Sequence, residues 1–405
     1  MNERAVTDSV WARQGWVVLA AVTALAASAL ISVRAQWWRG YIDLLVYRNG
    51  ARAWLDGKSI YGELPPVLGI ELPFTYPPPA ALLFAPLALL PLPLAEAAML
   101  TVSVLSLAVT LWLVLARLRP ALDRPVALAL VIVAVALAQL LEPVRQTLGF
   151  GQINLVLMAA VAADCLAREP RWPRGLLIGL AISVKLVPAA FLLYFLLRRD
   201  RKSLRTIAVS ALAAAGTGLL LMPGDSLRYW LHIILDTGRI GAPEFAGNQS
   251  IKGLLFRLGF AGPIATGLWL TLAALTLGLA VLWMRKLLDA GSPVSALLVN
   301  AFALLLVSPV SWSHHWVWTA PALLAAALAV ERGHRNPWFL GSVLAGTALL
   351  VVGPQWHLPW HRELDWNWWQ QLVGSSYVLV TFAVLCLAAA QPAGAGVRKA
   401  ASAAA

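Results

Sequence analysis

The amino-acid sequence predicts an all-α polytopic membrane protein with a long polar loop after its first apolar segment. Hydrophobic residues make up 60% of the 405 residues and charged residues only 12%. Apolar runs recur from end to end, which a water-soluble globule does not show. Lys and Arg occur in short clusters between these runs, as they do in the cytoplasmic loops of membrane proteins.

The formal net charge of +12 at pH 7 raises the question of a nucleic-acid partner. We expect none, because clustered Lys and Arg between apolar runs set membrane topology and contact anionic lipid headgroups. Cys165 and Cys386 both lie inside apolar runs. Neither a disulfide framework nor a thiolate metal site is indicated. We expect no metal and no cofactor.

Apolar segments close to bilayer-spanning length account for most of the chain. They are residues 14–34, 94–116, 125–141, 151–167, 206–222, 261–284, 294–309, 316–330, 338–352 and 372–390. The first has no convincing small-residue cleavage site and is followed by Gln-Trp-Trp-Arg. We therefore expect a retained helix with a cytoplasmic N-terminus.

Basic segments between the apolar segments predict which connections are cytoplasmic. They are residues 117–124, 168–174, 198–205, 285–286, 331–335 and the tail with Arg398 and Lys399. The remaining connections then lie on the opposite face, namely 35–79, 142–150, 222–260, 309–315 and 353–371. We expect one transmembrane domain, 1–390, and a disordered cytoplasmic tail, 391–405.

Two apolar pieces do not fit this alternation as simple spans. Residues 80–92 are short and contain two prolines, and residues 175–197 have basic clusters on both sides and contain Lys185 and Pro188. Each is explained by a broken or re-entrant pair of helices, or one basic loop faces outside. For 175–197 we favour the broken helix, because a charge in mid-membrane beside a proline marks a functional cavity.

The longest polar interruption, residues 36–83, carries the first candidate catalytic group. If the segment after the first span is helical, Asp43 and Tyr47 share one face. A carboxylate at the membrane surface among aromatic rings suits a general base that takes a proton from a hydroxyl. An interfacial helix whose acid pairs with Arg39 or Arg48 explains the same residue.

Polar groups near the outer ends of other spans are further candidates. Tyr76 lies in Phe-Thr-Tyr-Pro-Pro-Pro, which predicts a rigid extended entry to the next apolar piece. Arg145, Gln152 and Asn154 gather within residues 142–154. They either bond one another across helices or contact a substrate.

Lys185 lies far from both ends of its apolar segment. A lysine there either snorkels or pairs with a phosphate or carboxylate, and its depth favours the anion. Asn248 and Lys252, in Asn-Gln-Ser-Ile-Lys, close the long outer loop and also fit an ordinary solvated turn.

Residues 308–316, Ser-Pro-Val-Ser-Trp-Ser-His-His-Trp, are the sharpest local signal in the chain. His314 and His315 offer donors for a phosphate or a proton relay, and Trp312 offers a platform for a sugar. An aromatic belt explains the tryptophans but not the paired histidines. Zinc is disfavoured, because adjacent histidines do not share a helix face. The aromatic and acidic loop 353–371 suits either sugar recognition or membrane anchoring.

In their order along residues 14–390, these segments resemble the polyprenol-phosphate-sugar-dependent glycosyltransferases of family 87. The matching residues are Asp-Leu-Leu-Val-Tyr at 43–47, Leu-Asp-Gly-Lys-Ser-Ile-Tyr at 55–61, Phe-Thr-Tyr-Pro-Pro-Pro at 74–79, Gly-Gln-Ile-Asn at 151–154, Lys-Leu-Val-Pro at 185–188, Asn-Gln-Ser at 248–250 and the segment 308–316. The Ser-Trp-Ser-His-His-Trp part looks like the mannosyltransferase branch.

The resemblance implies a GT-C-type bundle of about 10–13 transmembrane helices in the plasma (inner) membrane, with short interfacial helices in the first loop. It implies an inverting, metal-independent transfer of mannose from a polyprenyl phosphate to a mannoside, phosphatidylinositol mannoside or lipoglycan on the outer face. Asp43 is the implied base, and Asp56 is the alternative. We expect donor contacts from His314, His315, Lys185, Arg145, Gln152, Asn154, Asn248 and Lys252, and acceptor or loop contacts from Tyr47, Asp56, Tyr76 and Trp312.

Other readings remain open at this point. Another sugar, such as arabinofuranose, can be transferred from the same kind of lipid carrier. Broken helices with a mid-membrane lysine also suit a transporter or flippase, although the chain shows no repeated halves. A non-catalytic assembly subunit is a third reading. The sequence does not specify the linkage, the acceptor or the oligomeric state.

Overall fold

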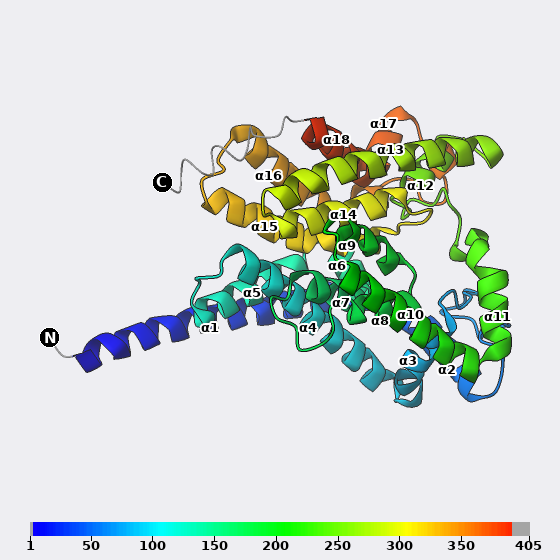
Figure 1. Ribbon diagram of the computed structural model, residues 1–405, viewed down its shortest axis with the longest axis horizontal. Coiled ribbons are helices and arrows are strands. Elements are labelled where there is room, and N and C mark those ends of the chain that lie inside the picture. The colour runs from blue at the N-terminus through cyan, green and yellow to red at the C-terminus, as the bar shows by residue number, and fades with distance from the viewer. Residues whose placement is uncertain (1–2, 391–405) are drawn as a thin grey trace.

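A computed structural model describes residues 3–390, and within this range the protein consists of α-helices, 3-10 turns and loops without a β-strand (Figure 1). The prediction of an all-α membrane protein is confirmed. The predicted disordered tail, 391–405, lies outside the described residues.

The helices of the first half lie between residues 3 and 240. They are α1 (Glu3–Arg34), α2 (Ile42–Leu55), α3 (Pro78–Leu89), α4 (Leu92–Leu118), α5 (Arg124–Ala138), α6 (Glu142–Phe150), α7 (Asn154–Leu166), α8 (Leu176–Val184), α9 (Leu192–Leu197), α10 (Arg201–Leu221) and α11 (Pro223–Leu231). Three 3-10 turns, η1 (Val187–Phe191), η2 (Ile233–Leu235) and η3 (Thr237–Ile240), belong to this half.

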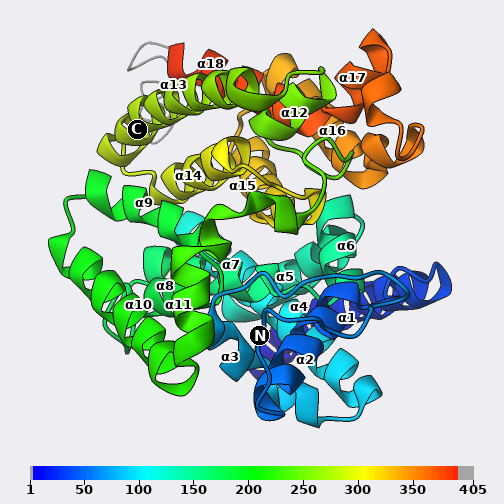
Figure 2. The same ribbon diagram turned by 90° about the vertical axis from the view of Figure 1, so that its right-hand side faces the viewer.

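The second half contains the remaining helices and turns. They are α12 (Ile251–Arg257), α13 (Gly262–Asp289), α14 (Pro293–Val307), η4 (Ser313–Trp318), α15 (Thr319–Glu331), α16 (Pro337–Val352), η5 (Pro354–His357), η6 (Glu363–Asp365), α17 (Trp368–Gly374) and α18 (Ser376–Ala390). Figure 2 shows α12–α18 above the helices of the first half, with α14 and α15 facing α7. The turn η4 packs against α6 and α7, so it joins the two halves.

Four helices are long and apolar enough to cross a membrane alone: residues 15–34 of α1, α4, α10 and α13. The bent pairs α5–α6 and α17–α18 raise the number to six if each pair is one span. Other predicted spans are shorter helices; α7 has 13 residues and α14 has 15. By length and composition this gives fewer full spans than the expected bundle, because helices such as α14 are shorter than a bilayer-spanning helix.

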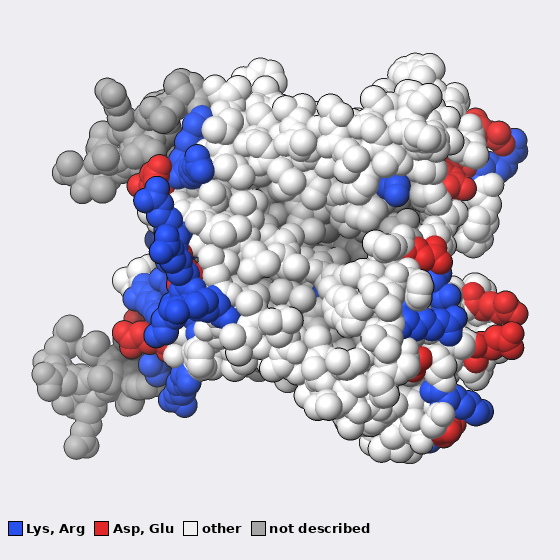
Figure 3. Space-filling view, turned by 45° about the vertical axis from the view of Figure 1, so that its right-hand side comes forward, with Lys and Arg blue, Asp and Glu red and all other residues white. Residues whose placement is uncertain are grey.

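Charged side chains gather at the two ends of this multi-pass membrane protein. Figure 3 shows a broad uncharged surface between an end rich in Lys and Arg and an end that carries both signs of charge. At the basic end, an ion pair joins Arg119 to Glu331. Arg117 lies near Arg168, Arg174 and Arg198 there. Four of the predicted cytoplasmic segments therefore lie together.

Residues 175–197 enter the bundle and return to the same end, as the broken-helix prediction requires. The helix α8 ends where Lys185 adopts an extended backbone, and η1 and α9 follow. Arg174 and Arg198, which flank the segment, both lie near Arg117. Tight packing holds α8 on α10, because a Cβ at Gly179 would lie 1.8 Å from the Ser210 hydroxyl. Lys185 thus stands at the tip of a re-entrant pair.

The first polar loop folds against the short apolar piece at residues 80–92, most of which lies in α3. Residues 74–77 form neither helix nor strand, with a bend at Tyr76, and α3 begins at Pro78. The arginines of α2 reach the other end of α3: Arg48 donates to the carbonyls of Leu87 and Leu90. Arg52 donates to the carbonyl of Ala88 at 2.9 Å. These arginines cap the free carbonyls of α3 and fix α2 on it.

The helix α11 crosses the far end of the bundle (Figure 1). Its Asp225 accepts hydrogen bonds from Ser59 and from the Ile60 backbone N–H, the latter at 3.0 Å. The ring of Tyr229 stacks on Tyr61 of the first loop with centroids 5.8 Å apart. The first loop and residues 222–260 are thereby joined into one cover over the end opposite the basic clusters.

Candidate active site

A cavity of about 330 Å³ lies beneath this cover, between the two halves. Its polar lining residues are Asp43, Thr75, Tyr76, Gln152, Lys185, Tyr229, Asp236, Arg239, Ser308, Trp312 and His315. Apolar side chains from α2, the 72–77 loop, residues 186–187, residues 233–240 and residues 309–310 complete the wall. Segments that are far apart in the sequence therefore meet at one site.

Asp43 lies in the first turn of α2, which places its carboxylate on the cavity wall. Tyr47, one turn further, is fully buried and donates its hydroxyl to the Gln152 side-chain oxygen. The Tyr47 hydroxyl lies 3.1 Å from that of Tyr76, whose hydroxyl is 3.3 Å from the same Gln152 oxygen. The predicted shared face is confirmed, and the three polar side chains brace the wall around the acid.

The surroundings of Asp43 disfavour its charged form. The helix α2 lies outside the candidate membrane spans, but burial in the cavity wall raises the pKa of the Asp43 carboxyl to about 6. The charge of Lys185 and a hydrogen bond from Gln152 act in the opposite direction. A carboxylate with a pKa near neutral is a better proton acceptor than an ordinary exposed aspartate.

Lys185 projects into the same cavity from the tip of the re-entrant pair. Its ammonium donates to the Asn154 side-chain oxygen at 3.0 Å and lies 3.3 Å from His315 Nε2. It also lies 5.6 Å above the ring centre of Tyr76. Beyond Lys185 and His315 the space continues as a narrow apolar pocket of about 40 Å³, lined by α7, η1 and α14. A cation at this boundary can hold an anion whose apolar part extends inward.

The two histidines of η4 have different surroundings. His315 lines the cavity, whereas His314 is 8% exposed and lies behind it. The His314 carbonyl accepts hydrogen bonds from Thr147 at 2.7 Å and from Asn154 at 3.0 Å. These bonds fix the backbone from which His315 projects. Of the two predicted histidines, only His315 therefore lies where it can contact a ligand that enters the cavity.

The Asn-Gln-Ser segment holds η4 in place. Ser313 and Gln249 form backbone hydrogen bonds, both 2.7 Å long, to Gly247 and Ser311. The Asn248 side chain is fully buried and accepts a bond of 3.0 Å from the Ser311 N–H. Asn248 does not line the cavity. In place of the predicted contact with the sugar donor, the hydrogen bonds of Asn248 position the histidine segment.

Comparison with known proteins decides the family. The model of glycosyltransferase family 87 matches residues 74–309 of the chain. The chain belongs to glycosyltransferase family 87. This confirms the resemblance inferred from the motifs and makes the protein a glycosyltransferase.

The relatives most similar to this family 87 glycosyltransferase include several that are named polyprenol-phosphate-mannose-dependent mannosyltransferases. The chain is 45% identical to the polyprenol-phosphate-mannose-dependent alpha-(1-2)-phosphatidylinositol mannoside mannosyltransferase of Mycolicibacterium smegmatis, over 85% of this chain and 82% of the relative. It is 43% identical to the Mycobacterium tuberculosis protein of the same name, over 86% of this chain and 84% of the relative. It is 33% identical to the M. smegmatis phosphatidylinositol pentamannoside mannosyltransferase, over 85% of this chain and 84% of the relative. No solved structure matches the chain.

Three further residues expected at the site lie away from the cavity of the family 87 chain. Asp56 is exposed at the end of α2, so the structure distinguishes it from Asp43. Arg145 lies over the Trp37 ring at 4.8 Å. Lys252 lies over the Trp269 ring at 5.1 Å. The last two form cation–π contacts on other helices.

The loop at residues 222–260 contributes cavity residues that sequence reasoning missed. Tyr229, Asp236 and Arg239 line the cavity, and so do Thr75 and Ser308 from other segments. The only signal in the sequence was that the 222–260 loop falls on the same face as the first loop. Spacing alone does not reveal which of its polar residues turn inward.

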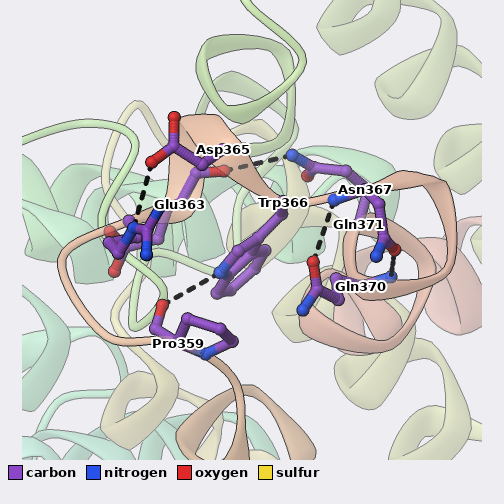
Figure 4. A network of polar contacts seen from close by, with 8 residues as sticks. Pro359, Glu363, Asp365, Trp366, Asn367, Gln370 and Gln371 are labelled. Carbon is purple, nitrogen blue, oxygen red and sulfur yellow. Dashed lines mark hydrogen bonds and ion pairs between the residues drawn. The ribbon is translucent and has the colours of Figure 1, made fainter.

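The aromatic loop 353–371 lies outside the cavity, and several of its hydrogen bonds are internal to the loop. Figure 4 shows Trp366 donating to the Pro359 carbonyl and Asn367 paired with Gln370. The Gln371 side chain donates to the Glu363 carbonyl at 3.2 Å. None of these residues lines the cavity. These polar groups bond within the loop and do not face the cavity, which favours the anchoring interpretation.

Glu142 supports the cavity from behind. It is fully buried and accepts hydrogen bonds from Ser313 and Trp356, both at 2.7 Å, and from Tyr377 at 2.8 Å. These donors belong to η4, η5 and α18, so one carboxylate joins three segments of the second half.

We expect Glu142→Ala to lower the melting temperature in detergent and the yield of folded protein. Each buried donor left without a partner costs about 1–3 kcal/mol. Differential scanning fluorimetry checks this, with Glu169→Ala as the control because Glu169 is exposed on a basic loop. Equal melting temperatures for the two variants would contradict the supporting role.

Proposed function

We propose that the protein transfers mannose from a polyprenyl-phosphate mannose to a hydroxyl of a phosphatidylinositol mannoside. The observation that carries the proposal is that Asp43, Lys185 and His315 line one cavity. A carboxylate and a cation are the two groups that glycosyl transfer from a sugar phosphate requires. The choice of mannose, of a polyprenol-phosphate carrier and of a phosphatidylinositol mannoside acceptor follows the names of the relatives that are 45% and 43% identical.

The proposed reaction is a single displacement. The acceptor oxygen bonds to the anomeric carbon of the mannose while the bond from that carbon to the phosphate oxygen breaks. Asp43 takes the proton of the acceptor hydroxyl, and the electron pair of the broken bond leaves with the polyprenyl phosphate. The configuration at the anomeric carbon is inverted.

Lys185 and His315 are proposed to hold the leaving phosphate. The ammonium opposes the negative charge that grows on the phosphate as the bond breaks, and the low dielectric of the cavity strengthens this effect. The apolar pocket beyond them suits the first part of the prenyl chain. Because Lys185 fills the charge-neutralising role that a metal ion fills elsewhere, we propose a metal-independent transfer.

The arrangement supports an orientation with the cavity outside the plasma membrane and the N-terminus in the cytoplasm. Basic clusters mark the cytoplasmic end of a membrane protein. Lys185 lies at the tip of a segment whose two ends, at Arg174 and Arg198, lie with the basic cluster. The cavity therefore opens toward the opposite end, where α2 and α11 lie (Figure 1).

The proposed function is tested with purified protein and radiolabelled donors. We expect label from polyprenyl-phosphate mannose to appear in phosphatidylinositol mannoside. A polyprenyl-phosphate arabinofuranose donor should give little product. Faster transfer of arabinofuranose would replace mannose by the pentose, and movement of intact donor across a vesicle membrane without product would favour a transporter.

The transfer rate should depend on pH through Asp43. The carboxylate must be ionised to accept a proton, and its pKa is raised to about 6. We therefore expect kcat/KM to fall about tenfold per pH unit below that pKa. A pH–rate profile in detergent checks this; a profile that is flat down to pH 4 would contradict the role.

A further inference from the structure

A second, more polar cavity opens beside the reaction cavity. This polar cleft has a volume of about 610 Å³. It is lined by Tyr61, Gly62, Glu63, Leu64, Glu71, Leu72, Pro73, Arg228 and Arg239. Leu72, Pro73 and Arg239 also line the reaction cavity, so the two spaces are contiguous. A ligand of the cleft can therefore extend a hydroxyl toward Asp43.

The charged side chains of the polar cleft are available to a ligand. The ion pairs among residues 3–390 join Arg119 to Glu331 and Arg362 to Asp365, and neither involves the cleft. Glu63 and Glu71 come from the first loop, while Arg228 belongs to α11. Two carboxylates and two guanidiniums thus face one open space without pairing to each other.

Arg239 stands at the junction of the two cavities. Its Nε is buried and has no hydrogen-bond partner among the described residues. A buried guanidinium nitrogen without a partner is costly, so the site is incomplete without an acceptor. The planar fork of an arginine matches the oxygens of a phosphate. Arg239 is therefore suited to an anionic group that enters from the polar cleft.

The outer face of α11 indicates how a lipid reaches the cleft. Tyr229 points inward and is buried, whereas Leu227, Trp230 and Leu231 are exposed. Apolar side chains on one face of a helix that crosses the end of the bundle suit the membrane interface. The acyl chains of a lipid can lie along this face while its headgroup enters beside Arg228.

We propose that the polar cleft binds the phosphoinositol headgroup of the acceptor. Arg239 holds the phosphodiester, and Glu63 and Glu71 accept hydrogen bonds from ring hydroxyls. This inference rests on the proposed function, because it assumes that the acceptor is a phosphatidylinositol mannoside. It assigns the donor phosphate to Lys185 and the acceptor phosphate to Arg239.

The first test measures acceptor binding without catalysis. Fluorescent phosphatidylinositol mannoside in detergent micelles is titrated into purified protein with no donor present. We expect Arg239→Gln to weaken binding roughly tenfold or more, because a hydrogen bond to a charged group is lost. Arg239→Lys should give an intermediate loss, since the charge remains without the fork. Arg362→Gln is the matched control. Equal affinities for Arg239→Gln and Arg362→Gln would overturn the proposal.

The second test separates the acceptor phosphate from the donor phosphate. Transfer is measured to phosphatidylinositol mannoside and to an alkyl mannoside, which has no phosphate. Arg239→Gln should raise the KM of the first acceptor roughly tenfold and leave the KM values of the alkyl mannoside and the donor within about twofold. A raised donor KM would overturn the assignment. Transfer to the alkyl mannoside tests the proposed function independently of the cleft.

Discussion

Asp43→Asn should lower kcat by about 10²–10⁴-fold, the usual contribution of a general base. The amide has nearly the same shape as the carboxylate, so the wall made with Tyr47 and Gln152 should persist. The variant keeps the cavity but cannot take the proton of the acceptor hydroxyl. The measurement is single-turnover transfer of labelled mannose at saturating donor and acceptor, together with the melting temperature of each protein.

Asp56→Asn is the matched control for this variant. Asp56 directly follows the same helix and lies in another of the matching motifs, but it is exposed outside the cavity. We expect its kcat to stay within about twofold of wild type, as for a surface change away from the site. Wild-type rates in Asp43→Asn, or a comparable loss in Asp56→Asn, would remove Asp43 from the role of base.

Lys185→Met should lower kcat by about 10²–10³-fold, the effect expected when a group that stabilises developing charge is removed. Methionine fills similar space and leaves Asn154 and His315 without the ammonium that contacts both. The leaving phosphate then develops its charge without an opposing cation. Because the phosphate is charged in the free donor as well, we also expect weaker donor binding, measured by titration of labelled donor.

Lys252→Met is the control for the loss of a lysine. The sequence also predicts Lys252 at the binding site of the sugar donor, but Lys252 contacts the Trp269 ring and does not line the cavity. Its variant should keep donor affinity and kcat close to wild type. The assignment of Lys185 fails if Lys185→Met binds the donor normally and transfers mannose at the wild-type rate.

The sequence allowed much of the fold to be predicted. Hydropathy indicated a helical membrane protein, and the two basic clusters around residues 175–197 indicated a segment that returns to the same end. The lengths of the membrane helices were predicted less well. An apolar run predicts a helix whether most of its side chains are exposed, as in α13, or buried among other helices, as in α14. Hydropathy cannot separate these environments.

Among the predicted site residues, those whose depth in the sequence is unusual line the cavity. Lys185 in an apolar segment and Asp43 beside a span have few structural explanations, and both line the cavity. Asn248 and Arg145 were harder to place, because a polar residue near a span end serves packing and binding equally well. Arg239 was missed because it lies in a long loop without periodicity, whose path depends on its contacts with the first loop.

The stereochemistry of the transfer tests the central claim most directly. The donor is polyprenyl-phosphate mannose of known anomeric configuration, labelled with ¹³C at the anomeric carbon, and the mannosylated acceptor is analysed by NMR. Displacement by an acceptor hydroxyl that Asp43 activates predicts labelled product with the opposite configuration. Retained configuration, or label that never reaches the acceptor, would contradict single-displacement transfer in this cavity.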